Sequence, residues 1–252
     1  AALYYMAMIA VYENDTELAE TYFQAAAALD SGNFWYRYRL AKLYSLTGRQ
    51  ELAVDMYEKM LKDFPKEKDV YFELVEMYAS QQEYQKALDT IDEIEQVIGV
   101  TESLAMYRFN ILRIMDRHED AYESLKKYNS RSSSPYVLST LADYEMSMYN
   151  DSTALAYYDE ALSLESDYAP ALLGKAETFR ITRRYDEYFD TLYEYIDGDG
   201  ASMQAKADYL MAVLQRTDPK FIRSFRRELD SAIVTAVEAY PKDSVALQTA
   251  AI

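Results

Sequence analysis

The chain has 252 residues, of which only 6 are Gly and 5 are Pro, and its formal net charge is −17. Sandwiches, barrels and glycine-loop nucleotide folds depend on turns and loops that use these two residue types, so the composition disfavours all three. The acidic charge likewise disfavours nucleic acids and anionic lipid surfaces as partners. The sequence contains no Cys and no stretch of about 18 uninterrupted apolar residues, so we expect neither disulfides nor membrane insertion.

Apolar residues recur with the i, i+3, i+4, i+7 spacing of amphipathic helices along almost the whole chain. The runs are about a dozen residues long, which is typical of helices in globular proteins. Short polar breaks separate them, at residues 13–15, 30–33, 47–49, 63–65, 99–101, 129–135, 149–151, 166–167 and 197–200. The pattern predicts helix, short turn and helix, repeated, so internal repeats are the first thing to look for.

A small residue marks a regular period. Four alanines follow one another at intervals of 34 residues, the next comes 33 later, and a tyrosine stands at the sixth position: Ala19, Ala53, Ala87, Ala121, Ala154 and Tyr188. Four residues after each stands a large apolar side chain: Phe23, Tyr57, Ile91, Leu125, Tyr158 and Leu192. The fullest copy reads Leu40-Ala41-x2-Tyr44-x3-Gly48-x4-Ala53-x3-Tyr57-x2-Met60-Leu61-x3-Pro65. This period and pattern resemble the tetratricopeptide repeat.

The resemblance implies an all-α fold, a right-handed superhelical solenoid of about seven antiparallel helical hairpins. We expect six tetratricopeptide-like repeats over residues 1–198, an atypical longer hairpin over 199–241 and the start of a truncated helix over 242–252. In the atypical part, a helix over 201–215 is followed by one long helix to about Tyr240. Two positions depart from the family's pattern: Arg108 stands where Leu is usual, and Tyr188 stands where a small residue is expected, which predicts a slightly opened hairpin.

Neither end of the sequence has the polar character of a terminal capping repeat. Residues 1–11 and 245–252 are both largely apolar. We therefore expect a segment of a longer protein or ends that dock on something, with fraying ends as the alternative.

Chemical motifs are scarce. The single histidine, His118, stands at the turn between two helices, where neighbouring repeats have Tyr84 and Tyr185, and we interpret it as structural. The run Asp197-Gly198-Asp199-Gly200 has the spacing that can open a calcium loop, but the later ligands of such a loop are missing, so we interpret it as a turn. We expect no catalytic residue, no metal and no cofactor.

The family resemblance places a binding groove on the first helices of the repeats. The groove positions that we take as partner-binding are Trp35, Tyr38, Arg39, Lys42, Phe72, Glu76, Tyr107, Asn110, Arg113 and Tyr136. Tyr4, Tyr5, Glu73, Asp143, Glu177 and Arg180 also fall on groove positions. Aromatic residues and Arg often anchor interfaces, whereas groove side chains that are merely solvated are the alternative interpretation. The groove holds four bases and four acids, so we expect the acidic excess on the outer face.

These observations predict a non-catalytic scaffold that binds an unidentified protein or peptide in its concave groove. The groove lacks the Lys/Asn pair with which some relatives bind the acidic tails of heat-shock chaperones, since Tyr38/Lys42 and Phe72/Glu76 occupy the corresponding positions. A recognition or sensory arm of a larger multidomain protein, and a self-association module, are the alternatives. The compartment stays open between cytoplasmic and periplasmic or exported. The Tyr-rich, Lys-poor, Cys-free composition resembles that of exported repeat proteins of anaerobic bacteria and favours the second.

Overall fold

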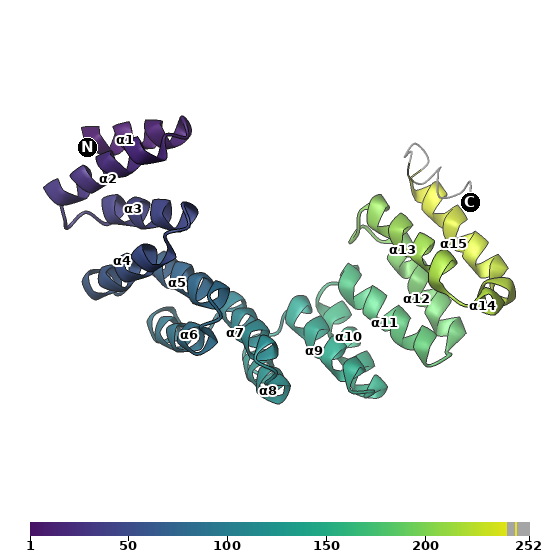
Figure 1. Ribbon diagram of the computed structural model, residues 1–252. Coiled ribbons are helices and arrows are strands. Elements are labelled where there is room, and N and C mark those ends of the chain that lie inside the picture. The colour runs from purple at the N-terminus through teal and green to yellow at the C-terminus, as the bar shows by residue number, and fades with distance from the viewer. Residues whose placement is uncertain (241–244, 246–252) are drawn as a thin grey trace. The chain divides into compact units, whose positions relative to one another are not determined.

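The computed structural model describes residues 1–240 and Val245. Regular structure in these residues consists of α-helices, 15 in number, which confirms the all-α prediction. The expected helix start over 242–252 lies outside the described residues, Val245 excepted. The chain divides into two compact units, residues 1–124 and 125–252. Figure 1 shows the helices following one another as hairpins in each unit.

The first unit holds three hairpins and the start of a fourth. They are formed by α1 (Ala2–Tyr12) with α2 (Thr16–Leu29), α3 (Phe34–Leu46) with α4 (Gln50–Asp63), α5 (Lys68–Ser80) with α6 (Tyr84–Ile98), and α7 (Glu102–Ile114) followed by α8 (His118–Asn129), which runs across the boundary between the units. The second helix of each of the first three hairpins also packs against the first helix of the next hairpin. Each hairpin therefore buries its apolar side chains against its neighbour, as in a solenoid.

The second unit continues the pattern with α9 (Pro135–Ser147) and α10 (Asp151–Leu164), then α11 (Ala169–Ile181) and α12 (Tyr185–Asp197). Three helices follow: α13 (Met203–Arg216), α14 (Pro219–Ser224) and α15 (Arg226–Ala239). The prediction of one long helix to about Tyr240 is wrong, because the helix is interrupted at Phe225. The bend lets the Phe225 ring pack 4.7 Å from the ring of Tyr185 and 4.9 Å from that of Phe221, measured between centroids.

The predicted register is confirmed by burial. All six small-position residues, from Ala19 to Tyr188, are fully buried, and so are the large apolar side chains four residues after them. A small side chain lets two helices approach closely, and the large one fills the space between neighbouring hairpins. The repeated sequence pattern therefore follows from the way in which the helices pack against one another.

A second signature with the same period lies in the backbone. Each of the first six hairpin turns contains one residue in the left-handed region: Asn14, Gly48, Gln82, Asp116, Tyr149 and Arg183. The amide of the next residue donates to the carbonyl five residues before it, at 2.8–2.9 Å. This 6→1 bond ends the helix and turns the chain back, although five of the six residues are not glycine.

Both sequence departures have a structural reason. Arg108 lies on α7 with its guanidinium paired to two carboxylates of α6, Asp92 at 2.7 Å and Glu95 at 3.0 Å. Tyr188 is buried beside Phe189, with ring centroids 4.8 Å apart, and its hydroxyl lies 3.3 Å from that of Tyr209 on α13. An ion pair and an aromatic cluster thus replace the expected apolar and small side chains.

Candidate functional site

The predicted groove residues of the first unit lie on consecutive first helices. Trp35, Tyr38, Arg39 and Lys42 are on α3, Phe72 and Glu76 are on α5, and Tyr107, Asn110 and Arg113 are on α7. We call the surface formed by these residues, with Tyr4, Tyr5 and Tyr36, the first-helix face. Side-chain contacts join each of its helices to the next, so the face is continuous from α1 to α7.

An aromatic cluster forms the α3 part of this face. The Phe34 ring stacks on Tyr38 with centroids 5.4 Å apart and meets Trp35 edge-on at 5.2 Å. Tyr38 also lies 5.9 Å from the buried Tyr57 ring, so the cluster is anchored in the core. Trp35 keeps 54% of its surface exposed. The indole of Trp35 is thus fixed by its aromatic neighbours but still exposed, and such groups often anchor protein interfaces.

A hydrogen-bonded network joins α3 to α5. The Tyr38 hydroxyl donates to Glu73 Oε1 at 3.1 Å, and Lys42 pairs with the same oxygen. Burial, followed by the negative charge of Glu73, raises the pKa of Tyr38 to about 12. The polar groups of Tyr38 and Lys42 therefore both bind Glu73 within the unit. They fix the geometry of the first-helix face and are not free to bind a partner.

The same arrangement joins α5 to α7. The Tyr107 hydroxyl donates to Glu76 at 2.8 Å, and the rings of Tyr107 and Phe72 lie 6.2 Å apart. The hydrogen bond to Glu76, followed by burial, raises the pKa of Tyr107. Further along α7, Asn110 is exposed and the exposed Arg113 has its guanidinium 5.6 Å from the Phe109 ring centroid.

The remaining groove positions lie in the second unit. Tyr136 is exposed at the start of α9. Asp143 accepts a 2.5 Å hydrogen bond from Tyr158, and Glu177 holds Arg180 as well as the hydroxyl of Tyr209. Glu73 and Glu76 are paired in the same way, so all four predicted groove acids form hydrogen bonds or ion pairs within their own unit.

Arg39 differs both from the paired acids and from Arg113, which is exposed to solvent. Its Nε is buried and has no hydrogen-bond partner among the described residues. Arg39 lines a hollow of about 410 Å³ between α1 and α3, together with the rings of Tyr4, Tyr5, Trp35 and Tyr36. A guanidinium donor left without an acceptor in an aromatic hollow is costly, by about 1–3 kcal/mol or more.

Sequence reasoning missed two parts of this site. Tyr36 falls between two groove positions, but its ring lies 5.3 Å from Tyr4 and closes one side of the hollow. The pairing of the groove acids was also missed, because it depends on which side chains of neighbouring repeats meet. The 34-residue period relates Tyr4 to Tyr38, so the repeat pattern gave no signal for Tyr36.

The positions considered for chemistry are ordinary surface or turn positions. The His118 ring is half exposed, with Nε2 2.9 Å from Asp116 Oδ1. Of the candidate calcium loop, Asp197 is the last residue of α12, and residues 198–200 belong to the turn that follows it. In residues 1–240 and Val245, no cluster of three or more His, Asp or Glu side chains is arranged to hold a metal ion. The helices in this part of the chain also lack the combination of length and apolarity that a membrane span needs.

A family model described as tetratricopeptide repeat matches residues 4–68 and 38–97. These overlapping matches cover the first three hairpins, which contain Ala19, Ala53 and Ala87. Residues 4–97 carry tetratricopeptide repeats. The resemblance seen in the sequence is thereby confirmed.

Solved tetratricopeptide structures share the fold over the full length. The C-terminal part of a TPR repeat-containing protein from Cytophaga hutchinsonii is 12% identical, with a TM-score of 0.68 and 98% of each chain covered. A tetratricopeptide repeat protein from Parabacteroides merdae is also 12% identical, with a TM-score of 0.54 and 99% of this chain and 96% of that one covered. No curated protein sequence matches the chain.

A third similar structure comes from a complex. A chain of Naa15/Naa10 bound to HypK-THB is 14% identical, with a TM-score of 0.54, and the match covers 95% of this chain and 36% of that one. Tetratricopeptide folds generally serve protein–protein interaction, and they are typically non-catalytic scaffolds. At these identities the likeness concerns the fold alone.

Proposed function

We propose that the first unit is a non-catalytic scaffold that binds an extended peptide or protein segment along the first-helix face. The observation that carries this proposal is Arg39, whose buried Nε lacks an acceptor while it lines an aromatic hollow beside an exposed Trp35. The partner supplies the missing oxygen, from a backbone carbonyl or a carboxylate, and an apolar group that covers the rings.

The rest of the face supports this role by being rigid before the partner arrives. Glu73 and Glu76 tie three successive first helices together through Tyr38, Lys42 and Tyr107. A preformed surface loses little conformational entropy on binding. Trp, Tyr and Arg are the residue types that contribute most to interface energies, and this face displays all three.

The test begins with peptides selected on the intact chain from a random library of about 12-residue peptides, a length that an extended segment needs to cross several helices. The affinity of the best peptide is then measured by calorimetry for Trp35→Ala and Arg39→Gln. We expect each change to weaken binding by about tenfold or more, as for a hot-spot residue.

The matched control is Tyr12→Ala, which removes an aromatic side chain that is 88% exposed at the end of α1 and away from the hollow. It should leave the affinity unchanged, and circular dichroism should be the same for all variants. If peptides bind and neither Trp35→Ala nor Arg39→Gln affects them, the assignment to this face is wrong.

A further inference from the structure

A second candidate site lies in the second unit, independent of the first-helix face. A cavity of about 430 Å³ opens between the α11–α12 turn and the α13–α14 corner. Arg180 and Tyr185 line it from one side, and Arg216, Lys220, Phe221 and Phe225 from the other. Its volume is in the range of sites that take a few side chains or a small ligand.

The apolar wall of this cavity is a packed aromatic triad. The Tyr185 ring lies 5.4 Å from Phe221 and 4.7 Å from Phe225, and Phe221 lies 4.9 Å from Phe225. All three rings are half-buried. The interruption of the helix at Phe225 creates this wall, because it turns two rings of the α14 segment onto Tyr185.

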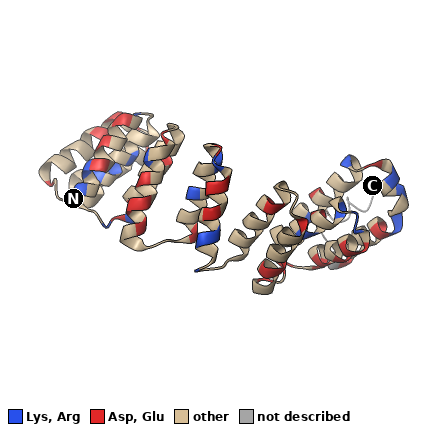
Figure 2. Ribbon diagram, turned by 90° about the horizontal axis from the view of Figure 1, so that it is seen from below, with Lys and Arg blue, Asp and Glu red and all other residues tan. Residues whose placement is uncertain are grey.

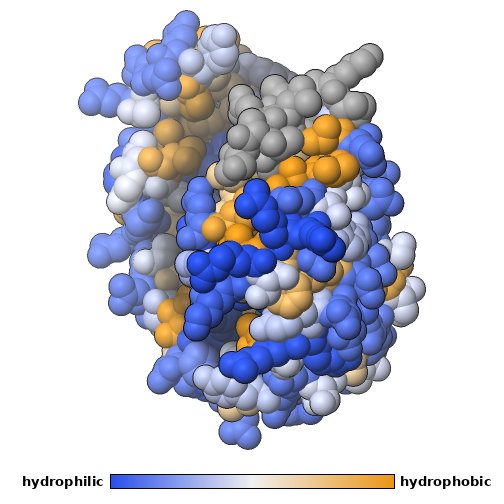
Figure 3. Space-filling view, turned by 90° about the vertical axis from the view of Figure 1, so that its right-hand side faces the viewer, coloured by the Kyte–Doolittle hydropathy of each residue, from blue (hydrophilic) through white to orange (hydrophobic). Residues whose placement is uncertain are grey.

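The segment that contributes Arg216 and Lys220 to the cavity is basic, which is unusual in so acidic a chain. Residues 216–227 contain five cations, Arg216, Lys220, Arg223, Arg226 and Arg227, against one acid, Asp218. Figure 2 shows Lys and Arg gathered where α13, α14 and α15 meet. In the face that Figure 3 presents, strongly hydrophilic side chains stand beside hydrophobic ones.

The cations that line the cavity differ in whether a carboxylate pairs with them. The Arg180 guanidinium is held by two hydrogen bonds to Glu177 Oε2, at 2.9 and 2.5 Å. Arg216 and Lys220 are exposed and pair with no carboxylate in residues 1–240. The side chain of Asp218 is occupied as the cap of α14, accepting from the Lys220 amide at 2.8 Å. Two uncompensated positive charges thus flank an aromatic wall.

We infer that this cavity binds an acidic peptide segment in which carboxylates adjoin a large apolar residue. Carboxylates pair with Arg216 and Lys220 by charge-assisted hydrogen bonds, and the apolar side chain covers the triad. A nucleic acid fits less well, because the three rings pack on one another instead of presenting free faces for stacking and the chain carries −17 overall.

The experiment is calorimetric titration of the full chain with the synthetic peptide acetyl-Glu-Glu-Phe-Glu-Glu-amide. Arg216→Gln combined with Lys220→Gln should weaken binding about tenfold or more, as expected for two charge-assisted contacts. The matched control is Lys127→Gln combined with Arg131→Gln, which removes the same charge from exposed positions elsewhere in the second unit and should change nothing. A peptide with Ala in place of Phe should bind more weakly to the parent chain.

Three results would overturn the inference. The first is binding that is equal in the parent and in the Arg216/Lys220 variant. The second is binding that is lost in Arg39→Gln instead, which places the acidic peptide on the first-helix face. The third is a thymidine oligonucleotide of about 12 residues that binds more tightly than the peptide and depends on Arg216 and Lys220. If the double variant does not fold, the amide shifts of residues 216–218, 220 and 221 in the parent, on adding the peptide, decide the question.

Discussion

The ring of Tyr158 on α10 lies directly against the backbone of Gly174 on α11. A Cβ at Gly174 would come closer than 3.0 Å to two ring carbons and the hydroxyl oxygen of Tyr158. Tyr158 is held in place because it is buried and its hydroxyl donates to Asp143 at 2.5 Å. Close approach of two hairpins in the second unit thus depends on the absence of one side chain.

This contact predicts that Gly174→Ala destabilises the protein, although Ala is the better helix former. The ring of Tyr158 cannot move without losing its hydrogen bond, so overpacking should cost on the order of 1–3 kcal/mol. Urea unfolding followed by circular dichroism measures it. Gly32→Ala is the control, because the added Cβ would meet only Asp30 Oδ1 at 3.8 Å. Equal midpoints for the two variants would contradict the contact.

The repeat register predicts that Ala53→Leu also destabilises the protein. Ala53 is fully buried where α4 meets its neighbours, so three extra carbon atoms should cost on the order of 1–3 kcal/mol. Ala28→Leu adds the same atoms at an exposed position on α2 and should change the free energy of unfolding by less than about 0.5 kcal/mol. An unchanged melting temperature for Ala53→Leu would count against the register.

The hairpin turns predict a substitution that stabilises. Tyr149 adopts φ 61°, a conformation that costs a residue with a Cβ about 1–2 kcal/mol, and its side chain is 90% exposed. Tyr149→Gly should therefore raise the free energy of unfolding by about 1 kcal/mol. The greater conformational entropy of glycine in the unfolded chain offsets part of this gain.

The reverse change tests the same reasoning at Gly48. A Cβ there would meet no atom within 4 Å, but its φ is +78°. Gly48→Ala should destabilise by about 1 kcal/mol through the backbone alone. Thermal unfolding of both variants gives the comparison, and a stabilised Gly48→Ala would show that the turn does not impose its φ.

The pKa of Tyr38 predicts a loss of stability at high pH. Burial and Glu73 raise it from 10 to about 12, so the folded protein holds this proton more tightly than the unfolded chain. The free energy of unfolding should accordingly fall as the pH rises from 10 through 12. NMR of tyrosine labelled at Cζ should show Tyr38 titrating late, and Glu73→Gln should lower its pKa while burial keeps it above 10. A Tyr38 that titrates at 10 in the parent chain would contradict the network.

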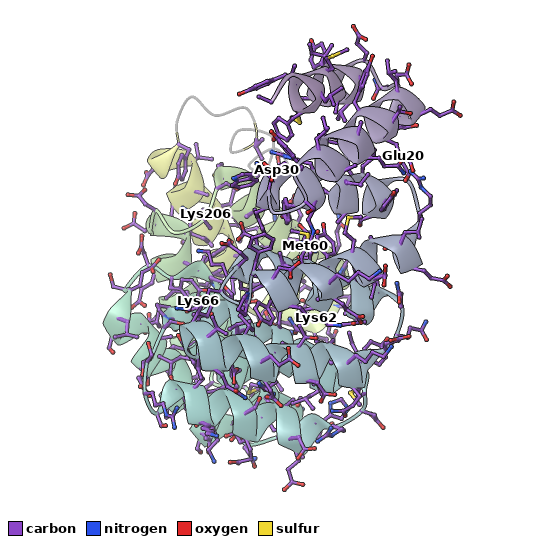
Figure 4. The ribbon with its side chains drawn as sticks, turned by 90° about the vertical axis from the view of Figure 1, so that its left-hand side faces the viewer. Glu20, Asp30, Met60, Lys62, Lys66 and Lys206 are labelled. Carbon is purple, nitrogen blue, oxygen red and sulfur yellow. The ribbon has the colours of Figure 1, made fainter. Side chains whose placement is uncertain are left out.

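Because Lys206 is buried, truncating its side chain should lower the free energy of unfolding substantially. Figure 4 labels this residue, which lies on α13. Its ammonium donates to the Gly198 carbonyl at 2.5 Å and to the Tyr240 hydroxyl at 3.0 Å, tying the end of α12 to the end of α15. Lys206→Ala should cost about 2–5 kcal/mol, as for other large buried side chains. The same substitution at the exposed Lys220 should change stability by less than about 0.5 kcal/mol.

The period of Ala19, Ala53 and Ala87 and the apolar spacing around it were enough to predict the helices, their pairing and most of the core. These features are local, since each hairpin buries itself only against the next, and the same packing problem recurs every 34 residues. Composition alone disfavoured strand-rich folds, because their turns use many Gly and Pro residues, whereas short helix-to-helix turns need few.

Tertiary structure alone decided which charges stay free. Glu73, Glu76 and Glu177 look like groove acids in the sequence, but each is paired with a side chain of its own unit, whereas Arg39 and Arg216 are not. The bend at Phe225 was equally hidden, since it follows from the packing of that ring on Tyr185. Periodicity tells which face a residue occupies. Whether its charge is compensated depends on distances of a few ångströms between side chains far apart in the sequence.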